Sequence, residues 1–238
     1  MTAEGPPEIS AIRAARALIL ERIAAAAARA RRDPGGVRVV AVTKTVPPDR
    51  VRVAVAAGFD LLGENRVQEA AAKASAISGA AWHLIGPLQS NKARRAVEIF
   101  DVIQSVDSLD LARRLDRLAG ELRPGRPLPV LLQVNVAADP TKAGFELGVV
   151  DRDLPAIIGL PALRVLGLMT IGPLGADAEA SRPTFVALRE LSNRLRTGDS
   201  RLGPELSMGM TDDFEVAVEE GATLVRIGRA IFGARPSA

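Results

Sequence analysis

Apolar residues along this chain fall into short runs of valine, leucine and isoleucine that alternate with longer segments of helical periodicity. Most runs are continuously apolar, which is typical of strands covered on both faces of a parallel sheet. The irregular stretch at 137–154 is expected to be a long loop with a short helix behind it. The pattern predicts eight strands, at 37–44, 61–65, 81–86, 102–106, 129–136, 163–171, 205–209 and 223–228.

Eight successive β/α units in 238 residues predict an α/β protein, a single (β/α)8 TIM-type barrel spanning residues 1–238. A doubly wound open sheet is the alternative, but no Gly-x-Gly-x-x-Gly motif follows the first strand. Residues 1–35 are expected to add an N-terminal helix that packs on the barrel. Its apolar stripe repeats at spacings of three and four: Ile12, Ala15, Ile19, Ile23, Ala26 and Ala30.

The composition excludes several kinds of site. The sequence has no cysteine and one histidine, His83, which excludes disulfide frameworks, cysteine-ligated zinc, histidine-rich metal sites and most histidine-based triads. We expect no metal. His83 follows Trp82 within a predicted strand, where a packed, hydrogen-bonded core histidine is favoured over a catalytic base.

The charge pattern argues against nucleic acid as a partner. The formal net charge is only +3, and no basic run is interleaved with stacking aromatics. No apolar run is long enough for a membrane span, and the N-terminus lacks the apolar core of a secretory signal. We therefore expect a cytoplasmic protein without a membrane partner. An open barrel mouth is compatible with a monomer.

Lys44 is the most informative candidate for chemistry. In a barrel, reactive groups gather where strands end at the C-terminal face, and Lys44 ends the first predicted strand. Partial desolvation there lowers the pKa of a lysine and favours a nucleophilic amine. From position alone, a strand-end lysine reaching into solvent is the commoner case. Glu64 and Asn65 end the second predicted strand and lie at the same face.

The loops after strands seven and eight are where barrels often bind phosphate. Here Gly209 and Gly228 allow close approach of the backbone to an anion, Ser207 offers a hydroxyl, and Arg229 adds a cation. Two ordinary βα turns are the alternative. Arg226 lies within an apolar strand and needs a partner. A salt bridge to Glu64 or another carboxylate and a place beside a cofactor ring nitrogen are equally compatible with its position.

Four segments resemble the pyridoxal phosphate homeostasis protein family, over about residues 39–233. They are Ala-Val-Thr-Lys ending at Lys44, Gly-Glu-Asn ending at Asn65, Trp-His-Leu-Ile-Gly-Pro-Leu-Gln-Ser-Asn-Lys ending at Lys92, and Leu-Ser-Met-Gly-Met-Thr-Asp-Asp ending at Asp213. The motifs Val-Arg-Ile-Gly and Ala-Ile-Phe-Gly close the match. The chain departs from the family pattern at Arg66, where an aromatic residue is usual, and is only loosely similar at 137–142.

The resemblance implies a barrel like the N-terminal domain of alanine racemase. It implies pyridoxal 5′-phosphate (PLP) bound as a Schiff base on Lys44, with Arg226 near the pyridine nitrogen. The phosphate would lie on Ser207, Gly209, Gly228 and Arg229, and Asn65 would belong to the cofactor site. The implied role is PLP and vitamin B6 homeostasis, with PLP, other B6 vitamers and PLP-requiring apo-enzymes as partners.

Three functions compete at this point: a PLP carrier or reservoir without substantial turnover, a PLP-dependent racemase or decarboxylase, and an aldolase-like Schiff-base enzyme without PLP. A racemase needs a second proton-transfer group opposite the lysine. The sequence has no tyrosine, and we expect no second domain after the eighth strand. An arginine beside the ring nitrogen also weakens the electron sink. The carrier is therefore preferred and no catalytic residue is assigned.

Overall fold

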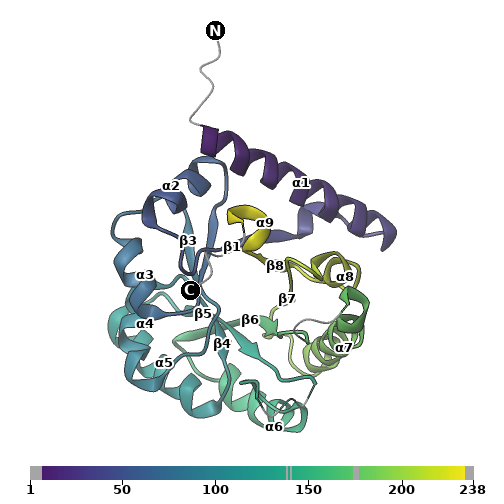
Figure 1. Ribbon diagram of the computed structural model, residues 1–238. Helices are drawn as coiled ribbons and strands as arrows, with labels where there is room; N and C mark the ends of the chain where they lie inside the picture. Colours follow the sequence, from purple (N-terminus) through teal and green to yellow (C-terminus); the bar gives the residue numbers. More distant parts are fainter. Residues whose placement is uncertain (1–6, 138, 140, 174–176, 234–238) are drawn as a thin grey trace.

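The structure, a computed structural model, describes residues 7–137, 139, 141–173 and 177–233. Eight parallel strands form a closed barrel in which each strand pairs with the next and β8 pairs with β1. This confirms the predicted (β/α)8 barrel, and helices surround it on the outside (Figure 1). The strands are β1 Arg38–Val42, β2 Leu61–Glu64, β3 Ala81–Leu84, β4 Val102–Val106, β5 Leu128–Gln133, β6 Leu163–Met169, β7 Glu205–Met210 and β8 Leu224–Ile227.

Each strand is followed by helical structure that covers the sheet. A 12-residue helix, α6, begins inside the stretch for which the sequence predicted only a short one. Within the described part of the chain, no helix combines the length and apolar character needed to cross a membrane. The helices are α1 Pro7–Arg29, α2 Pro48–Ala56, α3 Val67–Ala74, α4 Ala93–Ile99, α5 Leu109–Leu122, α6 Leu147–Ile158, α7 Arg182–Gly198, α8 Phe214–Glu219 and α9 Arg229–Phe232, with short 3₁₀ turns η1 Pro34–Gly36, η2 Ser90–Lys92 and η3 Ala178–Ser181.

The extra helix α1 lies outside the barrel beside α2, α8 and α9 (Figure 1). Ile12, Ile19 and Ile23 of the predicted stripe are buried and belong to the main hydrophobic core. Burying such side chains contributes about 1.5–3 kcal/mol each, so the apolar face explains why α1 docks on the barrel.

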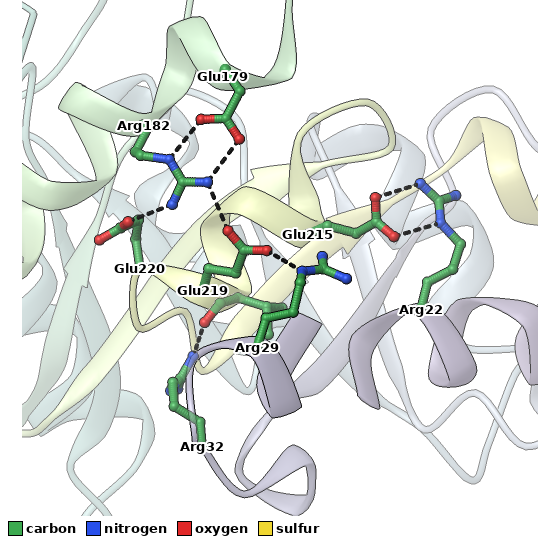
Figure 2. Close-up of polar contacts among 9 residues, drawn as sticks. Arg22, Arg29, Arg32, Glu179, Arg182, Glu215, Glu219 and Glu220 are labelled. Carbon is green, nitrogen blue, oxygen red and sulfur yellow. Dashed lines mark hydrogen bonds and ion pairs between the residues drawn. The ribbon is translucent and has the colours of Figure 1, made fainter. Parts of the chain in front are cut away.

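A network of ion pairs joins α1, η3 and the first residue of α7 to α8 (Figure 2). Arg182 donates to Glu179, Glu219 and Glu220 at 2.6–2.7 Å. Arg29 donates to the same Glu219 at 2.6 Å. Arg22 makes a second contact between α1 and α8, an ion pair with Glu215 (Figure 2). The Arg22 guanidinium also stacks on the ring of Phe214. The network thus fastens α1 and α7 to α8, the helix that follows β7.

We expect Arg182→Met to lower the free energy of unfolding by about 1–2 kcal/mol at neutral pH, since one guanidinium serves three carboxylates, two of which, Glu219 and Glu220, are largely shielded from water. The hydrogen bond from Arg182 lowers the pKa of Glu219 in the folded protein. The stabilisation is therefore present above the ordinary glutamate pKa of about 4.3 and is lost as the pH falls through the lowered value. Urea unfolding at pH 7 and pH 3 measures this; an equal difference at both would contradict it.

Candidate functional site

Lys44 lies in a tight turn just beyond β1 rather than within the strand. The turn is closed by the Val46 N–H, which donates to the Thr43 carbonyl at 3.0 Å, and Thr45 has a φ of 64°. A positive φ at the third position corresponds to a type II turn, where glycine is usual. The sequence thus predicted the right end of the barrel for Lys44 but missed the turn, which directs the side chain independently of the strand's alternation.

Lys44 lines a pocket of about 250 Å³ between the β1–α2 and β8–α9 connections. Gly228 and Arg229 from the end of β8 line the same pocket, so the structure brings three of the predicted site residues together. A Cβ on Gly228 would lie 3.4 Å from the Val42 side chain and carbonyl, which leaves little space for a larger residue. Arg229 pairs with Asp212 from the neighbouring β7–α8 loop. The two loops predicted to hold an anion are therefore in contact.

Arg226 is buried in the barrel interior and ends a chain of polar side chains. Its guanidinium donates to the Ser207 hydroxyl and the Thr170 carbonyl, both at 2.8 Å. Ser207 donates in turn to Gln104 Oε1 at 2.6 Å, and the Gln104 amide lies 2.7 Å from His83 Nδ1. Burial lowers the pKa of Arg226 to about 10, and the charge of Asp213 opposes the shift. Arg226 therefore remains a cation at neutral pH.

The interpretation of Arg226 as a salt-bridge partner of Glu64 is wrong. Glu64 pairs instead with Lys73, at 2.6 Å. Among the described residues, no carboxylate lies within ion-pair distance of Arg226. A buried guanidinium with neutral hydrogen-bond partners is unusual, because isolated charges are costly to bury. A place for Arg226 beside a cofactor ring nitrogen stays a prediction, and Arg226 is not among the described residues that line the Lys44 pocket.

Ser207 and Gly209 have structural contacts that the sequence did not reveal. Ser207 is fully buried, and its hydroxyl already donates to Gln104 and accepts from Arg226. These contacts favour a role in orienting Arg226, and direct contact of Ser207 with phosphate stays a prediction. Gly209 has a φ of 88°, and a Cβ there would lie 2.5 Å from the Ala217 side chain. Glycine is therefore needed at this position because the backbone packs closely on α8.

Asn65 is not among the described residues that line the Lys44 pocket. It follows β2 and lines a second pocket of about 590 Å³ together with Arg66 and Lys92. His83 is a packed core histidine, as predicted: burial, followed by the positive charge of Arg38, lowers its pKa to about 4. No group of three or more potential metal ligands occurs in the described ranges.

Three polar residues of the site escaped sequence interpretation: Gln104, Thr170 and Lys73. Gln104 and Thr170 are each buried within or directly after an apolar strand. A polar residue inside an apolar run is a usable signal, because buried polar groups need partners. Lys73 sits in an ordinary amphipathic helix, and nothing in its spacing predicts that it is buried.

Most of this chain is similar to proteins of one known family. Residues 18–236 match the family model of the alanine racemase N-terminal domain. A protein of Pseudomonas aeruginosa named pyridoxal phosphate homeostasis protein is 45% identical over 227 residues, covering 92% of this chain and 94% of the relative. The chain belongs to the pyridoxal phosphate homeostasis protein family. The Escherichia coli K12 member of that name is 40% identical over 229 residues, with the same coverage. The family resemblance predicted from the motifs is confirmed.

Solved structures of the family agree with the fold. PipY of Synechococcus elongatus PCC7942, solved with PLP bound, is 44% identical, with a TM-score of 0.79 and coverage of 90% of this chain and all of PipY. An alanine racemase of Bartonella henselae has a TM-score of 0.70 but only 15% identity, and it supports the fold alone.

Proposed function

We propose that this chain binds PLP as a Schiff base on Lys44 and acts in PLP homeostasis as a carrier or reservoir. The observation that carries the proposal is Lys44 at the barrel mouth, lining one pocket with Gly228 and Arg229. PLP, when bound, supplies an aldehyde that condenses with an amine and an anionic phosphate that needs hydrogen-bond donors and cations. PipY, a family member of similar sequence, has been solved with PLP bound.

The residues of this chain fit such a cofactor. Lys44 offers the amine, and Arg229 on the joined loops offers a cation to the phosphate, beside the backbone at Gly228. Arg226, two residues earlier on β8, is a buried cation with neutral partners and is suited to face a ring nitrogen. Ser207 orients Arg226 in this arrangement. Asn65 is the member of the predicted set with the least support, since it lines another pocket.

The lining of the Lys44 pocket supports a role without substantial turnover. Among the residues that the structure describes, its charged members besides Lys44 are Arg50 and Arg229. Arginine stays protonated in proteins and is a poor base. His83 is buried against Gln104. A loss of general acid–base catalysis removes about 10²–10⁴-fold in rate. Racemase activity is the alternative, favoured by the alanine racemase domain match.

Exchange of α-protons distinguishes these two functions. We expect the PLP-loaded protein, incubated with L- and D-amino acids in deuterated water, to exchange α-protons no faster than free PLP within about tenfold. The measurement is proton NMR, with PLP alone as the control. Exchange at enzyme-like rates with one amino acid would contradict the carrier function and support racemase activity. Transfer of PLP to a PLP-requiring apo-enzyme and binding of other B6 vitamers belong to the same proposal and are measurable with the loaded protein.

Arg229→Gln tests the phosphate contact. We expect PLP affinity to fall about tenfold while pyridoxal affinity stays unchanged, because a charge-assisted hydrogen bond to phosphate is lost. The side chain of Arg229 is 57% exposed, so the fold should tolerate the change. Arg201→Gln, which also removes a surface pair with an aspartate, is the matched control. Equal losses for PLP and pyridoxal would place the phosphate elsewhere.

A further inference from the structure

A buried ion pair contacts the backbone immediately before Lys44. Lys73 Nζ lies 2.6 Å from Glu64 Oε1 and donates to the Thr43 carbonyl at 2.8 Å. The Thr43 hydroxyl donates to the same carboxylate oxygen at 2.7 Å. Glu64 and Thr43 are fully buried, and Lys73 is 6% exposed. The carbonyl that precedes Lys44 is therefore held by an ammonium group from α3.

The backbone after Lys44 is held from the same helix. The Thr45 N–H donates to Glu69 Oε2 at 3.1 Å. Glu69 and Lys73 are four residues apart on α3, so one face of the helix reaches both sides of the turn. The two peptide units that flank Lys44 are thus tied to one rigid element.

The turn needs such restraint because Thr45 is strained. Its φ of 64° lies in the left-handed region, which a β-branched residue rarely adopts. Strain of this kind amounts to about 1–3 kcal/mol and persists only where the surroundings enforce it. A relaxed turn would redirect Lys44.

Stability alone is a poor explanation for the ion pair. Burial raises the pKa of Glu64, against the hydrogen bonds from Lys73 and Thr43. The second carboxylate oxygen, Oε2, is buried and has no hydrogen-bond partner within the described ranges. Replacing a buried pair by groups of similar volume is often neutral or stabilising.

We propose that Glu64, Lys73 and Glu69 are positioning residues that hold the strained turn and thereby direct the Lys44 amine toward the cofactor. The inference rests on the proposed attachment of PLP to Lys44. It predicts that removal of these contacts weakens PLP binding through the conformation of the turn. It also predicts that relief of the strain at Thr45 repairs the loss, since glycine adopts a positive φ freely.

The test compares Glu64→Gln/Lys73→Met, which leaves no unpaired buried charge, with the same double variant carrying Thr45→Gly. Dissociation constants for PLP come from the visible absorbance on titration, and urea unfolding of the ligand-free proteins gives stability. We expect the double variant to bind PLP about tenfold more weakly, and Thr45→Gly to restore most of the affinity without restoring any lost stability. Glu69→Gln, at a more exposed position, should show a smaller loss with the same rescue.

Arg182→Met is the matched control, because it removes ion pairs remote from Lys44 and should lower stability without changing the dissociation constant. Wild-type affinity in the folded double variant, or a loss that Thr45→Gly does not repair, would overturn the positioning role. If the double variant does not fold, the same comparison is made with Glu69→Gln. Its loss of PLP affinity, and the repair of that loss by Thr45→Gly, then test the positioning role. Failure of the wild-type protein to take up PLP would instead refute the proposed function.

Discussion

Lys44→Ala is expected to abolish the covalent adduct that borohydride traps after incubation with PLP. Lys44 lines the pocket that contains Gly228 and Arg229, and alanine offers no nucleophile there. The visible band of bound PLP should disappear together with the adduct. Retained binding of a weaker, non-covalent kind is compatible with the account, because Arg226 and Arg229 remain. The measurement is the mass of the intact protein after reduction.

Lys92→Ala is the control for Lys44→Ala. Lys92 also lies at the barrel mouth, but it lines the separate pocket with Asn65 and Arg66. Its removal should leave the adduct unchanged. An adduct that survives in Lys44→Ala and is lost in Lys92→Ala would move the attachment site to the second pocket.

Arg226→Gln is expected to weaken PLP binding by about 10–100-fold, since hydrogen bonds that involve a charged group contribute about 1.5–3 kcal/mol. The ligand-free protein should change in stability by about 1 kcal/mol or less. The amide of glutamine can still donate within the interior, and a buried charge without an ion-pair partner is removed. Titration with PLP and urea unfolding measure the two effects.

Ser207→Ala separates two roles for its hydroxyl. If Ser207 orients Arg226, as the hydrogen bonds suggest, affinity for PLP and for pyridoxal should fall together. A loss confined to PLP would restore direct phosphate binding by Ser207. An Arg226→Gln variant that binds PLP like the wild type would remove Arg226 from the cofactor site.

The fold could be predicted from the sequence because its signals are local and repeated. Continuous apolar runs at regular intervals identified all eight strands, and the stripe through Ile12, Ile19 and Ile23 identified the extra helix. The position of Lys44 at the C-terminal face could be predicted because it follows the first apolar run directly. Its place two residues beyond β1 did not, because the turn depends on contacts from Lys73 and Glu69 that are distant in the chain.

The partners of the site residues were harder to predict than their positions. Glu64 and Arg226 lie on β2 and β8, the two strands that flank β1, so an ion pair between them was a reasonable expectation. The structure pairs Glu64 with Lys73 and leaves Arg226 with neutral oxygens. Side-chain partners depend on which way each side chain turns inside the barrel, and strand periodicity alone does not determine that choice.

The most direct test of the central claim is to identify the lysine that carries PLP in the unaltered protein. The protein is incubated with PLP, reduced with borohydride, digested and mapped by mass spectrometry. We expect the phosphopyridoxyl group on the peptide that contains Lys44. Predominant labelling of Lys73, Lys92 or Lys142, or no stable label at all, would contradict the account.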